Sequence, residues 1–414
     1  MGPPPGPPPQ RTSPRLPARA RRWARLWMAP LAPLALAAAC SRAPVQPSAP
    51  PPGLAPAPTA KRAWAPSPAP RPSGTAPAVA AASAVTPEEA LPTTAGPVRL
   101  LAVGDIMLGR TVGERIARAP HSSPFAHVED LLRGADLAVG NLECVLGEGG
   151  VEAKKSFTFR APSEALPLLK ASGLDVVLVA NNHILDFGVE PLGPMLASLD
   201  ASGIRHAGAG LTEDQAHAPA IVTSRGLRVA FLGYVSVPRE GGGESGFNAR
   251  EWEARGAQPG VAWADPPRVA TEVAAARARA DVVIVLLHAG NEELRTTSRA
   301  QRDAARAAID AGAAAVLGSH PHRVQALERY QRGVIAYSLG DFVFDGRDIL
   351  SAMLELELTR SGVTATRWIP LHTARGTPTP YVGRARADWK LYLERLAPPE
   401  PPPRPRRPAR DQPR

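Results

Sequence analysis

Short apolar runs that each end in a polar cluster are the feature that most restricts how this chain can fold. The runs are rich in Val, Leu and Ile and cover residues 98–103, 136–139, 175–179, 281–287 and 313–317. Near-continuous apolar runs of this length are typical of strands buried on both faces of a sheet. Helical patterns separate them at residues 164–171, 191–202 and 298–311. Strand, polar cluster and helix in repeated order predict an α/β fold.

The polar clusters are made of side chains that commonly bind metal ions or take part in hydrolysis. From the first run to the last they contain Asp105; Asn141 and Glu143; Asn181, Asn182 and His183; His288; and His320 and His322. In α/β sheets, ligands collect at the carboxyl ends of the strands. Because all five clusters fall at predicted strand ends, we expect them to form one site.

The densest cluster is the Ser-His-Pro-His motif at residues 319–322, in which a proline stiffens the turn between two imidazoles. Imidazole is a good ligand for Zn, Mn and Fe. Two imidazoles on one rigid turn can each hold one ion of a close pair, about 3.5–4 Å apart in two-metal sites. Taken alone, the motif fits a solvated His-rich loop equally well, so its strength comes from the other clusters.

Several other polar residues have both a functional and a structural interpretation. Asp105 could cap the following helix, and Asp186 could be a cap or a hydrogen-bond partner of a site residue; we favour the partner role for Asp186. Arg110 and Arg160 could clamp a phosphate or carboxylate, or could lie at the surface. Cys144 is the one cysteine within residues 97–397, which excludes an internal disulfide there, and we interpret it as a small buried residue.

Six motifs in this order resemble the CapA-like capsule synthesis family, which is associated with poly-γ-glutamate capsules. They are GDIMLGR (104–110), GNLE (140–143), ANNH (180–183), LLH (286–288), GSHPH (318–322) and YSLGDF (337–342). The family belongs to the calcineurin-like metallophosphoesterase superfamily, and the resemblance covers about residues 98–345. It implies an α/β fold in which a β-sandwich is flanked by helices and carries its metal site at the carboxyl ends of the strands.

The resemblance further implies two divalent ions, Mn, Zn or Fe, joined by a shared carboxylate. The residues that would bind the first ion are Asp105 and His322, those that would bind the second are Asn182, His288 and His320, and the bridging residue is Glu143. His183 would bind no metal and would donate a proton or a hydrogen bond to the leaving oxygen. From the residues themselves we add Arg110, which would clamp a phosphate or carboxylate of the substrate. The possible supporting residues are Asn141, Asn181, Asp186 and Arg160.

Two positions depart from the superfamily pattern. The first carboxylate is often followed two residues later by a His ligand, and this chain has Met107 there. A thioether is a poor ligand for these ions, so water or Asn141 would have to complete the first position. Asp341 stands where Asn is more usual, and it would either add negative charge to the site or cap a strand. The Met107 departure lowers the expectation of full dinuclear phosphoesterase activity.

The high net charge of the chain comes from its ends. The 414 residues carry a formal charge of +10, and residues 1–96 and 398–414 hold net charges of +8 and +3. Residues 97–397 are left with 33 basic and 34 acidic side chains. Nucleic-acid-binding domains concentrate positive charge on one face. The predicted globular domain at 97–397 is nearly neutral, which argues against a nucleic-acid partner.

The N-terminal region has the layout of a secretory signal. A basic stretch ends at Arg25, and an apolar stretch follows at residues 26–39, which is too short to span a bilayer. Leu36-Ala37-Ala38-Ala39-Cys40 resembles a bacterial lipoprotein cleavage box, so we predict a signal peptide at 1–40 with lipidation of Cys40. A plain signal peptide cleaved near Ala39 is the alternative. This places the protein at the bacterial cell envelope, on a membrane.

The segments that flank the domain are rich in proline. Residues 41–96 are dominated by Pro and Ala, which cannot form a core, so we predict a disordered linker between membrane and domain. Residues 398–414 form a Pro/Arg-rich tail that we also predict to be disordered.

Two functional classes follow from these observations. The first is a metal-dependent, phosphoesterase-like hydrolase that acts on a phosphoester or on another bond of an envelope polymer. The second is a non-catalytic factor that binds metal and guides an anionic polymer during capsule synthesis or export. Both classes imply an anionic envelope polymer, the membrane and capsule synthesis or export proteins as partners. The number of bound ions and cleavage of a generic phosphodiester would distinguish them.

Overall fold

The computed structural model describes residues 96–240, 247–346 and 348–396. The predicted signal peptide with Cys40, the linker up to residue 95 and the tail at 398–414 lie outside the described residues. Of the helices in the part that the structure describes, none has both the length and the apolar character needed to cross a bilayer.

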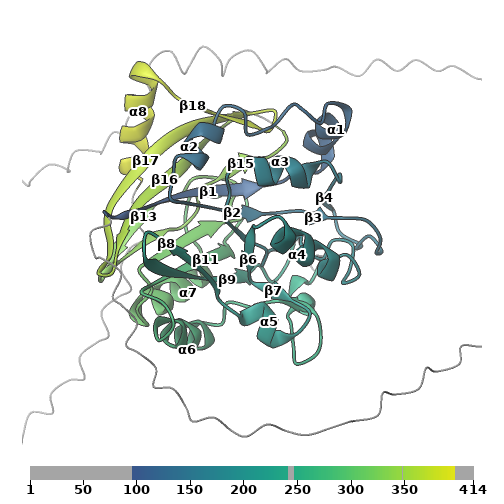
Figure 1. Cartoon of the computed structure of the whole chain (residues 1–414), viewed down its shortest axis with the longest axis horizontal. Helices are drawn as coiled ribbons and strands as arrows, with labels where there is room; N and C mark the ends of the chain where they lie inside the picture. The colour runs from purple at the N-terminus through teal and green to yellow at the C-terminus, as the bar shows by residue number, and fades with distance from the viewer. Residues whose placement is uncertain (1–95, 241–246, 347, 397–414) are drawn as a thin grey trace, which may run out of the picture. The chain divides into compact units, whose positions relative to one another are not determined.

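The first sheet has the strand order β18-β17-β16-β1-β2-β5-β6, and β15 pairs with β1 beside this path (Figure 1). Its strands are β1 (Val98–Ile106), β2 (Leu137–Leu142), β5 (Val176–Leu178), β6 (Arg205–Ala207), β15 (Asp341–Val343), β16 (Ile349–Thr359), β17 (Gly362–Ala374) and β18 (Thr377–Pro380). The strands β1, β2, β5 and β6 run parallel, and β15 is parallel to β1. The strands β16, β17 and β18 continue the sheet in antiparallel order.

The second sheet has the order β13-β14-β12-β11-β9-β8. Its strands are β8 (Ala220–Ser224), β9 (Leu227–Ser236), β11 (Val282–Ala289), β12 (Ala315–Ser319), β13 (Leu327–Tyr330) and β14 (Gly333–Ala336). The central strands β9, β11, β12 and β14 are parallel, and the edge strands pair antiparallel. Two short pairs complete the strands, β3 (Val145–Leu146) with β4 (Arg160–Ala161) and β7 (Ala209–Gly210) with β10 (Gly260–Val261).

Alternate residues of the second sheet face two different apolar layers. In β9, Val229 and Phe231 join the core that the two sheets share. Ala230 and Leu232 belong to a second core, with residues of α6 (Pro266–Arg277) and α7 (Arg299–Asp310). Figure 1 shows these two helices on the side of the sheet away from β1. The apolar runs are therefore buried on both faces, and the predicted α/β fold is confirmed.

The remaining helices pack on the first sheet, on its edges or on the short β3–β4 and β7–β10 pairs. They are α1 (Arg110–Arg118), α2 (Glu129–Arg133), α3 (Ala165–Ala171), α4 (Leu192–Ala201), α5 (Glu213–His217) and α8 (Gly383–Glu394), with a 3-10 turn η1 (Ala249–Trp252). The helices α3, α4 and α7 coincide with the three predicted helical patterns. Helix α7 begins with a capping box between Ser298 and Gln301, which explains why the helix starts there.

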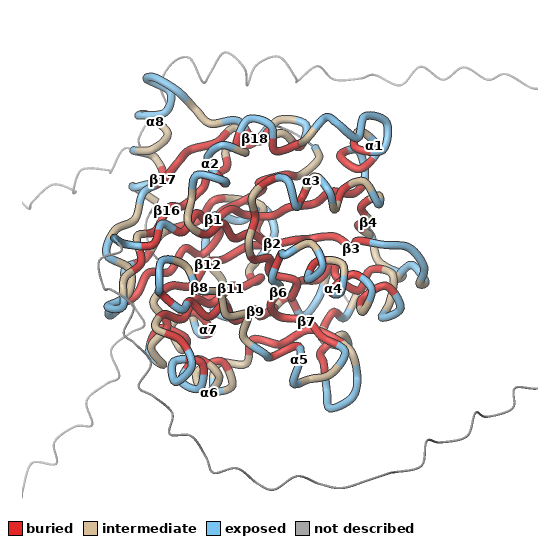
Figure 2. The backbone as a smooth tube through the Cα atoms, viewed as in Figure 1, coloured by how far each residue is buried: buried red, intermediate tan, exposed pale blue. Residues whose placement is uncertain are grey.

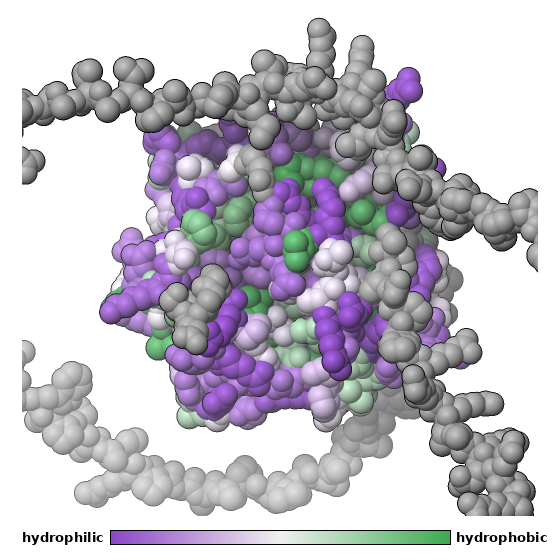
Figure 3. Space-filling view, turned by 180° about the vertical axis from the view of Figure 1, so that it is seen from behind, coloured by the Kyte–Doolittle hydropathy of each residue, from purple (hydrophilic) through white to green (hydrophobic). Residues whose placement is uncertain are grey.

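Burial follows these layers closely. Figure 2 shows the central strands as buried along most of their length, while exposed residues gather on helices and connecting loops. In the view from behind, Figure 3 shows a mostly hydrophilic surface with scattered apolar residues. Apolar surface is thus concentrated between the layers, as the hydrophobic effect requires.

The two sheets lie very close together at Gly233 of β9. A Cβ atom at this position would lie 2.5 Å from the backbone oxygen of Ala207 in β6 and 2.8 Å from Leu178 Cδ1 in β5. Real Cβ atoms essentially never come this close to a backbone oxygen. Glycine at 233 is therefore required by the distance between the sheets.

We predict that Gly233→Ala destabilises the protein, because the added methyl group must push the two sheets apart. Overpacking of this kind costs about 1–3 kcal/mol of unfolding free energy, which urea denaturation would measure. The matched control is Gly193→Ala in α4, where a Cβ would meet Leu211 at an ordinary contact distance of 3.5 Å. The control should be neutral or slightly stabilising; equal stability of the two variants would contradict the packing argument.

Candidate metal centre

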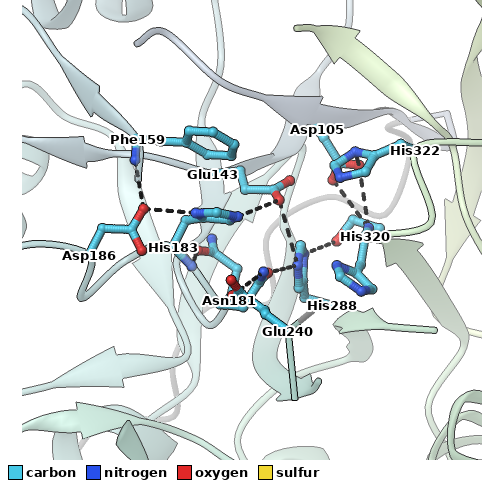
Figure 4. A network of polar contacts seen from close by, with 12 residues as sticks. Asp105, Glu143, Phe159, Asn181, His183, Asp186, Glu240, His288, His320 and His322 are labelled. Carbon is cyan, nitrogen blue, oxygen red and sulfur yellow. Dashed lines mark hydrogen bonds and ion pairs between the residues drawn. The ribbon is translucent and has the colours of Figure 1, made fainter. Parts of the chain in front are cut away.

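The parallel registers bring the predicted clusters to the same end of both sheets. In the first sheet Asp105 pairs in register with Asn141 of β2 and with Asp341 of β15. In the second sheet His288 of β11 pairs with Ser319, the last residue of β12. The end of each strand thus fixes the position of its ligand cluster. Figure 4 shows the side chains of these clusters converging from both sheets.

Asn141 is the hydrogen-bonding link between the sheets. Its Nδ2 lies 2.8 Å from Asp105 Oδ1, 3.1 Å from Glu143 Oε2 and 3.1 Å from His288 Nδ1. Asn181 holds Asn141 in turn, because Asn181 Nδ2 donates to Asn141 Oδ1 at 3.1 Å. Both asparagines therefore contact the predicted ligands or fix a neighbour that does.

Glu143 lies at the middle of the cluster and is fully buried. Its Oε1 atom is 3.9 Å from His183 Nε2 and 3.9 Å from His288 Nε2. Burial raises the pKa of Glu143 well above its usual range, and the nearby Asp105 carboxylate raises it further. Protons and cations therefore compete for this carboxylate.

His320 and His322 lie on a turn with an unusual backbone. Their φ angles are 95° and 54°, a region that side chains other than glycine seldom adopt. Strained conformations of this kind cluster at functional sites. The turn directs the His320 backbone N–H toward Asp105 Oδ2 at 3.3 Å, and it places His322 Nδ1 3.4 Å from the same atom.

The two imidazoles of this turn are in different electrostatic environments. Burial and the charge of His322 together lower the pKa of His320 to about 3. For His322, burial also acts to lower the pKa, but the Asp341 carboxylate 2.8 Å from Nδ1 and the hydrogen bond to Asp105 outweigh it and raise the pKa. A neutral imidazole at 320 is in the form that binds metal ions.

Asn182 and His288 form the other side of the cluster. Asn182 Oδ1 lies 2.7 Å from His288 Nε2, and His288 Nδ1 lies 3.0 Å from Ser319 Oγ. Complete burial lowers the pKa of His288 well below its usual range, and the neighbouring His320 and His322 lower it further. His288 is therefore neutral and has its ring fixed from both sides.

Among the described residues there are three groups in which the potential ligand atoms all lie within 4.8 Å of one another. They are Glu143, His288 and His320; Asp105, Glu143 and His322; and Glu292, His320 and His322. The first two groups share Glu143, as a carboxylate that bridges two ions would require. The third adds Glu292, an exposed residue that no sequence motif had indicated.

Two buried atoms in these groups support a cation site. Glu143 Oε1 and His320 Nδ1 have no hydrogen-bond partner among the described residues. Buried polar atoms almost always have a partner, so an exception calls for an ion, a water or a substrate atom. Carboxylate, imidazole and amide oxygen ligands suit Mn, Fe and Zn. The residues present therefore fit a divalent metal centre.

His183 lies beside this cluster and is held from two sides. Its Nδ1 is 2.7 Å from Asp186 Oδ2, and its ring stacks on Phe159 with 3.8 Å between the ring centroids. Burial lowers the pKa of His183 well below its usual range, and the charge of Lys155 lowers it further. Burial raises the pKa of Asp186 to about 7. The arrangement leaves His183 Nε2 on the side of Glu143.

The two arginines of the sequence analysis lie in different surroundings. Arg110 is partly exposed, pairs with Asp345 at 3.2 Å, and has its guanidinium carbon 5.8 Å from the ring centroid of Phe159. It thus stands at the rim next to the ring that covers His183. Arg160 instead donates to the Gly149 carbonyl and lies 3.6 Å above the Phe187 ring. Its contacts favour a structural role.

The structure also places the two residues that depart from the superfamily pattern, Met107 and Asp341, and the lone cysteine of the domain. Met107 is fully buried, and its sulfur accepts a hydrogen bond from the Gly109 backbone N–H at 3.1 Å. Asp341 directs Oδ1 at His322 Nδ1, so it adds a carboxylate beside the cluster. Cys144 is buried in the shared core, and burial raises the pKa of its thiol to about 12.

Sequence reasoning missed two charged residues of the site, Lys155 and Glu240. Lys155 Nζ lies 2.7 Å from both Asp186 Oδ1 and Glu240 Oε1. Glu240 Oε1 also accepts a hydrogen bond from Asn182 Nδ2. Both residues lie in connecting segments, where a charged residue is ordinarily interpreted as solvated, and no local pattern separates them from their neighbours.

Comparisons with known proteins agree with the resemblance. Residues 99–346 match the family described as Bacterial capsule synthesis protein PGA_cap. The PGA biosynthesis protein CapA of Bacillus subtilis (strain 168) is 32% identical over 284 residues, which cover 67% of this chain and 72% of that protein. The capsule biosynthesis protein CapA of Bacillus anthracis is 32% identical over 289 residues, with 67% and 68% covered.

A solved structure, that of TT1561 from Thermus thermophilus, is 11% identical and covers 65% of this chain and 98% of its own, with a TM-score of 0.35. That score is too low to support an argument. The family match spans more than half of this chain, and the two CapA proteins exceed 30% identity over two thirds of their length. The chain therefore belongs to the bacterial capsule synthesis protein family PGA_cap.

Proposed function

We propose that this protein acts at the cell envelope in the synthesis or export of a capsule polymer of the poly-γ-glutamate type, through a metal-dependent, phosphoesterase-like hydrolase site. Family membership supports the capsule role. The observation that carries the hydrolase assignment is the buried Glu143 shared by two groups of metal-ligating atoms. The two sheets with a common core and ligands at the strand ends support a sandwich of the calcineurin-like metallophosphoesterase type.

In this proposal two divalent ions would occupy the first two ligand groups. Asp105, Glu143 and His322 would hold one ion, and Glu143, His288 and His320 the other, with Asn182 Oδ1 close to His288 as a further ligand. Bound ions would supply Lewis acidity toward a phosphoryl or carbonyl oxygen and make a water nucleophilic near neutral pH.

The protein's own residues would bind the substrate and handle the proton. Asp186 accepts a hydrogen bond from His183 Nδ1, which fixes the ring with Nε2 on the side of Glu143; Nε2 would take the proton released by the attacking water and pass it to the leaving oxygen. Phe159 covers one face of His183 and excludes water from it. Arg110 stands beside Phe159 at the rim, where its guanidinium would hold an anionic group of the substrate.

Met107 favours the second candidate function, a non-catalytic factor that uses the site to bind polymer carboxylates. The Met107 sulfur accepts a hydrogen bond from the Gly109 N–H and supplies no ligand, so the ion held by Asp105, Glu143 and His322 would lack one protein ligand of the usual dinuclear pattern. A weak first position would lower catalytic power but leave metal and carboxylate binding. Metal analysis of the purified protein, together with an assay on a generic phosphodiester, separates the two functions.

We predict that Glu143→Gln loses most bound metal. The substitution keeps the shape of the side chain but removes the charge that both ligand groups share. Without this charge the two cations would repel each other across a short gap. Metal content by mass spectrometry should fall from two ions per chain toward none. The control is Glu357→Gln in β16, outside all three ligand groups; if Glu143→Gln kept both ions, the bridging assignment would be wrong.

His183→Ala should give the opposite result. His183 belongs to none of the three ligand groups, so the variant should keep its metal. Turnover of a phosphodiester should fall about 10²–10⁴-fold, the usual contribution of a general acid. If no substrate is found, polymer yield in cells replaces turnover. Full polymer yield from His183→Ala, together with lost yield from the metal-depleted Glu143→Gln, would favour the non-catalytic function.

The envelope anchor is tested at Cys40, which lies outside the described residues. If Cys40 carries a lipid, Cys40→Ala should move the protein from the membrane fraction to the soluble envelope fraction, because one signal for membrane attachment is removed. Cell fractionation with detection of the protein would measure this. Unchanged membrane association would exclude the lipid anchor, and Cys144→Ala serves as the control for loss of a cysteine.

A further inference from the structure

Lys155 is a buried lysine beside the candidate metal centre, and none of the functions above uses it. It lies in the segment between β3 and β4, and its side chain has no exposed surface. Its Nζ atom lies 2.7 Å from Asp186 Oδ1 and 2.7 Å from Glu240 Oε1, and it donates a hydrogen bond to the backbone carbonyl of Asn182.

The surroundings of this ammonium group are specific for a cation. Besides the two carboxylates, the rings of Phe247 and Trp252 have their centroids 5.5 and 5.2 Å from Nζ, within the range of cation–π attraction. Removing a charged group from water costs several kcal/mol unless paired partners offset it. Such a cage is seldom needed for stability alone, because apolar residues fill a core at lower cost.

Each carboxylate that binds Lys155 also holds one residue of the site. Asp186 divides its two oxygens, since Oδ1 faces Lys155 while Oδ2 accepts from His183 Nδ1 and from the Phe159 backbone N–H. Lys155 therefore determines which oxygen of Asp186 is available to His183. Loss of the lysine would leave the Phe159 N–H as the remaining backbone donor to this carboxylate and would weaken its hold on the imidazole.

Glu240 acts in the same way on Asn182. An ionised carboxylate can only accept hydrogen bonds, so the Asn182 amide must turn its nitrogen toward Glu240. The amide oxygen then faces the other way and lies 2.7 Å from His288 Nε2, on the side of the ligand cluster. An amide oxygen can bind a metal ion and an amide nitrogen cannot. The Lys155–Glu240 pair thus selects the ligating orientation of Asn182.

We propose that Lys155 is a positioning residue of the metal centre, which orients the ligand Asn182 through Glu240 and the proton-transfer residue His183 through Asp186. The inference rests on the proposed function, because it assigns Lys155 a role toward the same metal centre. Three segments that follow β3, β5 and β9 meet at this one ammonium group, so the relative positions of ligand and proton donor depend on it.

The test compares Lys155→Met with Lys154→Met, which removes the neighbouring exposed lysine. Each full-length variant is titrated with Co²⁺ by calorimetry, and the visible absorption of the bound Co²⁺ is recorded. Loss of a partner of a metal ligand typically costs 10–100-fold in metal affinity. In Lys155→Met we expect this loss of affinity for one of the two Co²⁺ ions, together with a changed absorption spectrum. In Lys154→Met we expect wild-type affinity and spectrum.

A second variant covers the possibility that Lys155→Met leaves two buried acids unpaired and does not fold. Glu240→Gln keeps Lys155 paired with Asp186 but places an amide group opposite Asn182. It should also lower the affinity for one of the two Co²⁺ ions. If Lys155→Met or Glu240→Gln folds and keeps the wild-type Co²⁺ affinity and spectrum, the inference is overturned while the proposed function stands. Wild-type protein that binds no Co²⁺, Mn²⁺ or Zn²⁺ would instead overturn the proposed function together with the inference.

Discussion

The arrangement of this protein depends on two carboxylates, Asp105 and Glu143, that are buried together where the two sheets meet. Neither has exposed surface, and burial together with the Asp105 charge raises the pKa of Glu143. Burying ionised carboxylates costs several kcal/mol each unless charges or hydrogen bonds compensate. The donors around them, from Asn141, His320 and His322, offset part of this cost, and a divalent cation would offset the rest.

Backbone geometry makes this close meeting of charges possible. A Cβ atom at Gly104, the residue before Asp105, would lie 1.7 Å from the Gly340 backbone oxygen. Glycine at 104 therefore lets β1 and the segment before β15 approach, which brings Asp105 next to Asp341 in register. The positive φ angles of His320 and His322 then turn two imidazoles toward the same carboxylates.

The distribution of charge limits how the protein would bind the anionic polymer of the proposed function. The net positive charge lies in the terminal segments, and residues 97–397 are nearly neutral. The described part of the chain thus has no large excess of positive charge to attract a polyanion at long range. Recognition at the site would depend on local groups such as Arg110, held beside Phe159 by its pairing with Asp345, and on the cations themselves.

The sequence alone indicated the α/β class, five of the buried strands, three of the helices and the polar residues at the strand ends, because apolar runs and helical patterns are local properties of the chain. Predicted helices at 164–171, 191–202 and 298–311 are present as α3, α4 and α7. The family resemblance added ligand roles that spacing could not supply. Only the tertiary structure placed Lys155 and Glu240 in the site, since their roles come from contacts with Asp186 and Asn182 across three loops. The tertiary structure also decided that Arg160 contacts Gly149 and Phe187 while Arg110 lies beside Phe159, because contacts between distant segments leave no periodic pattern in the sequence.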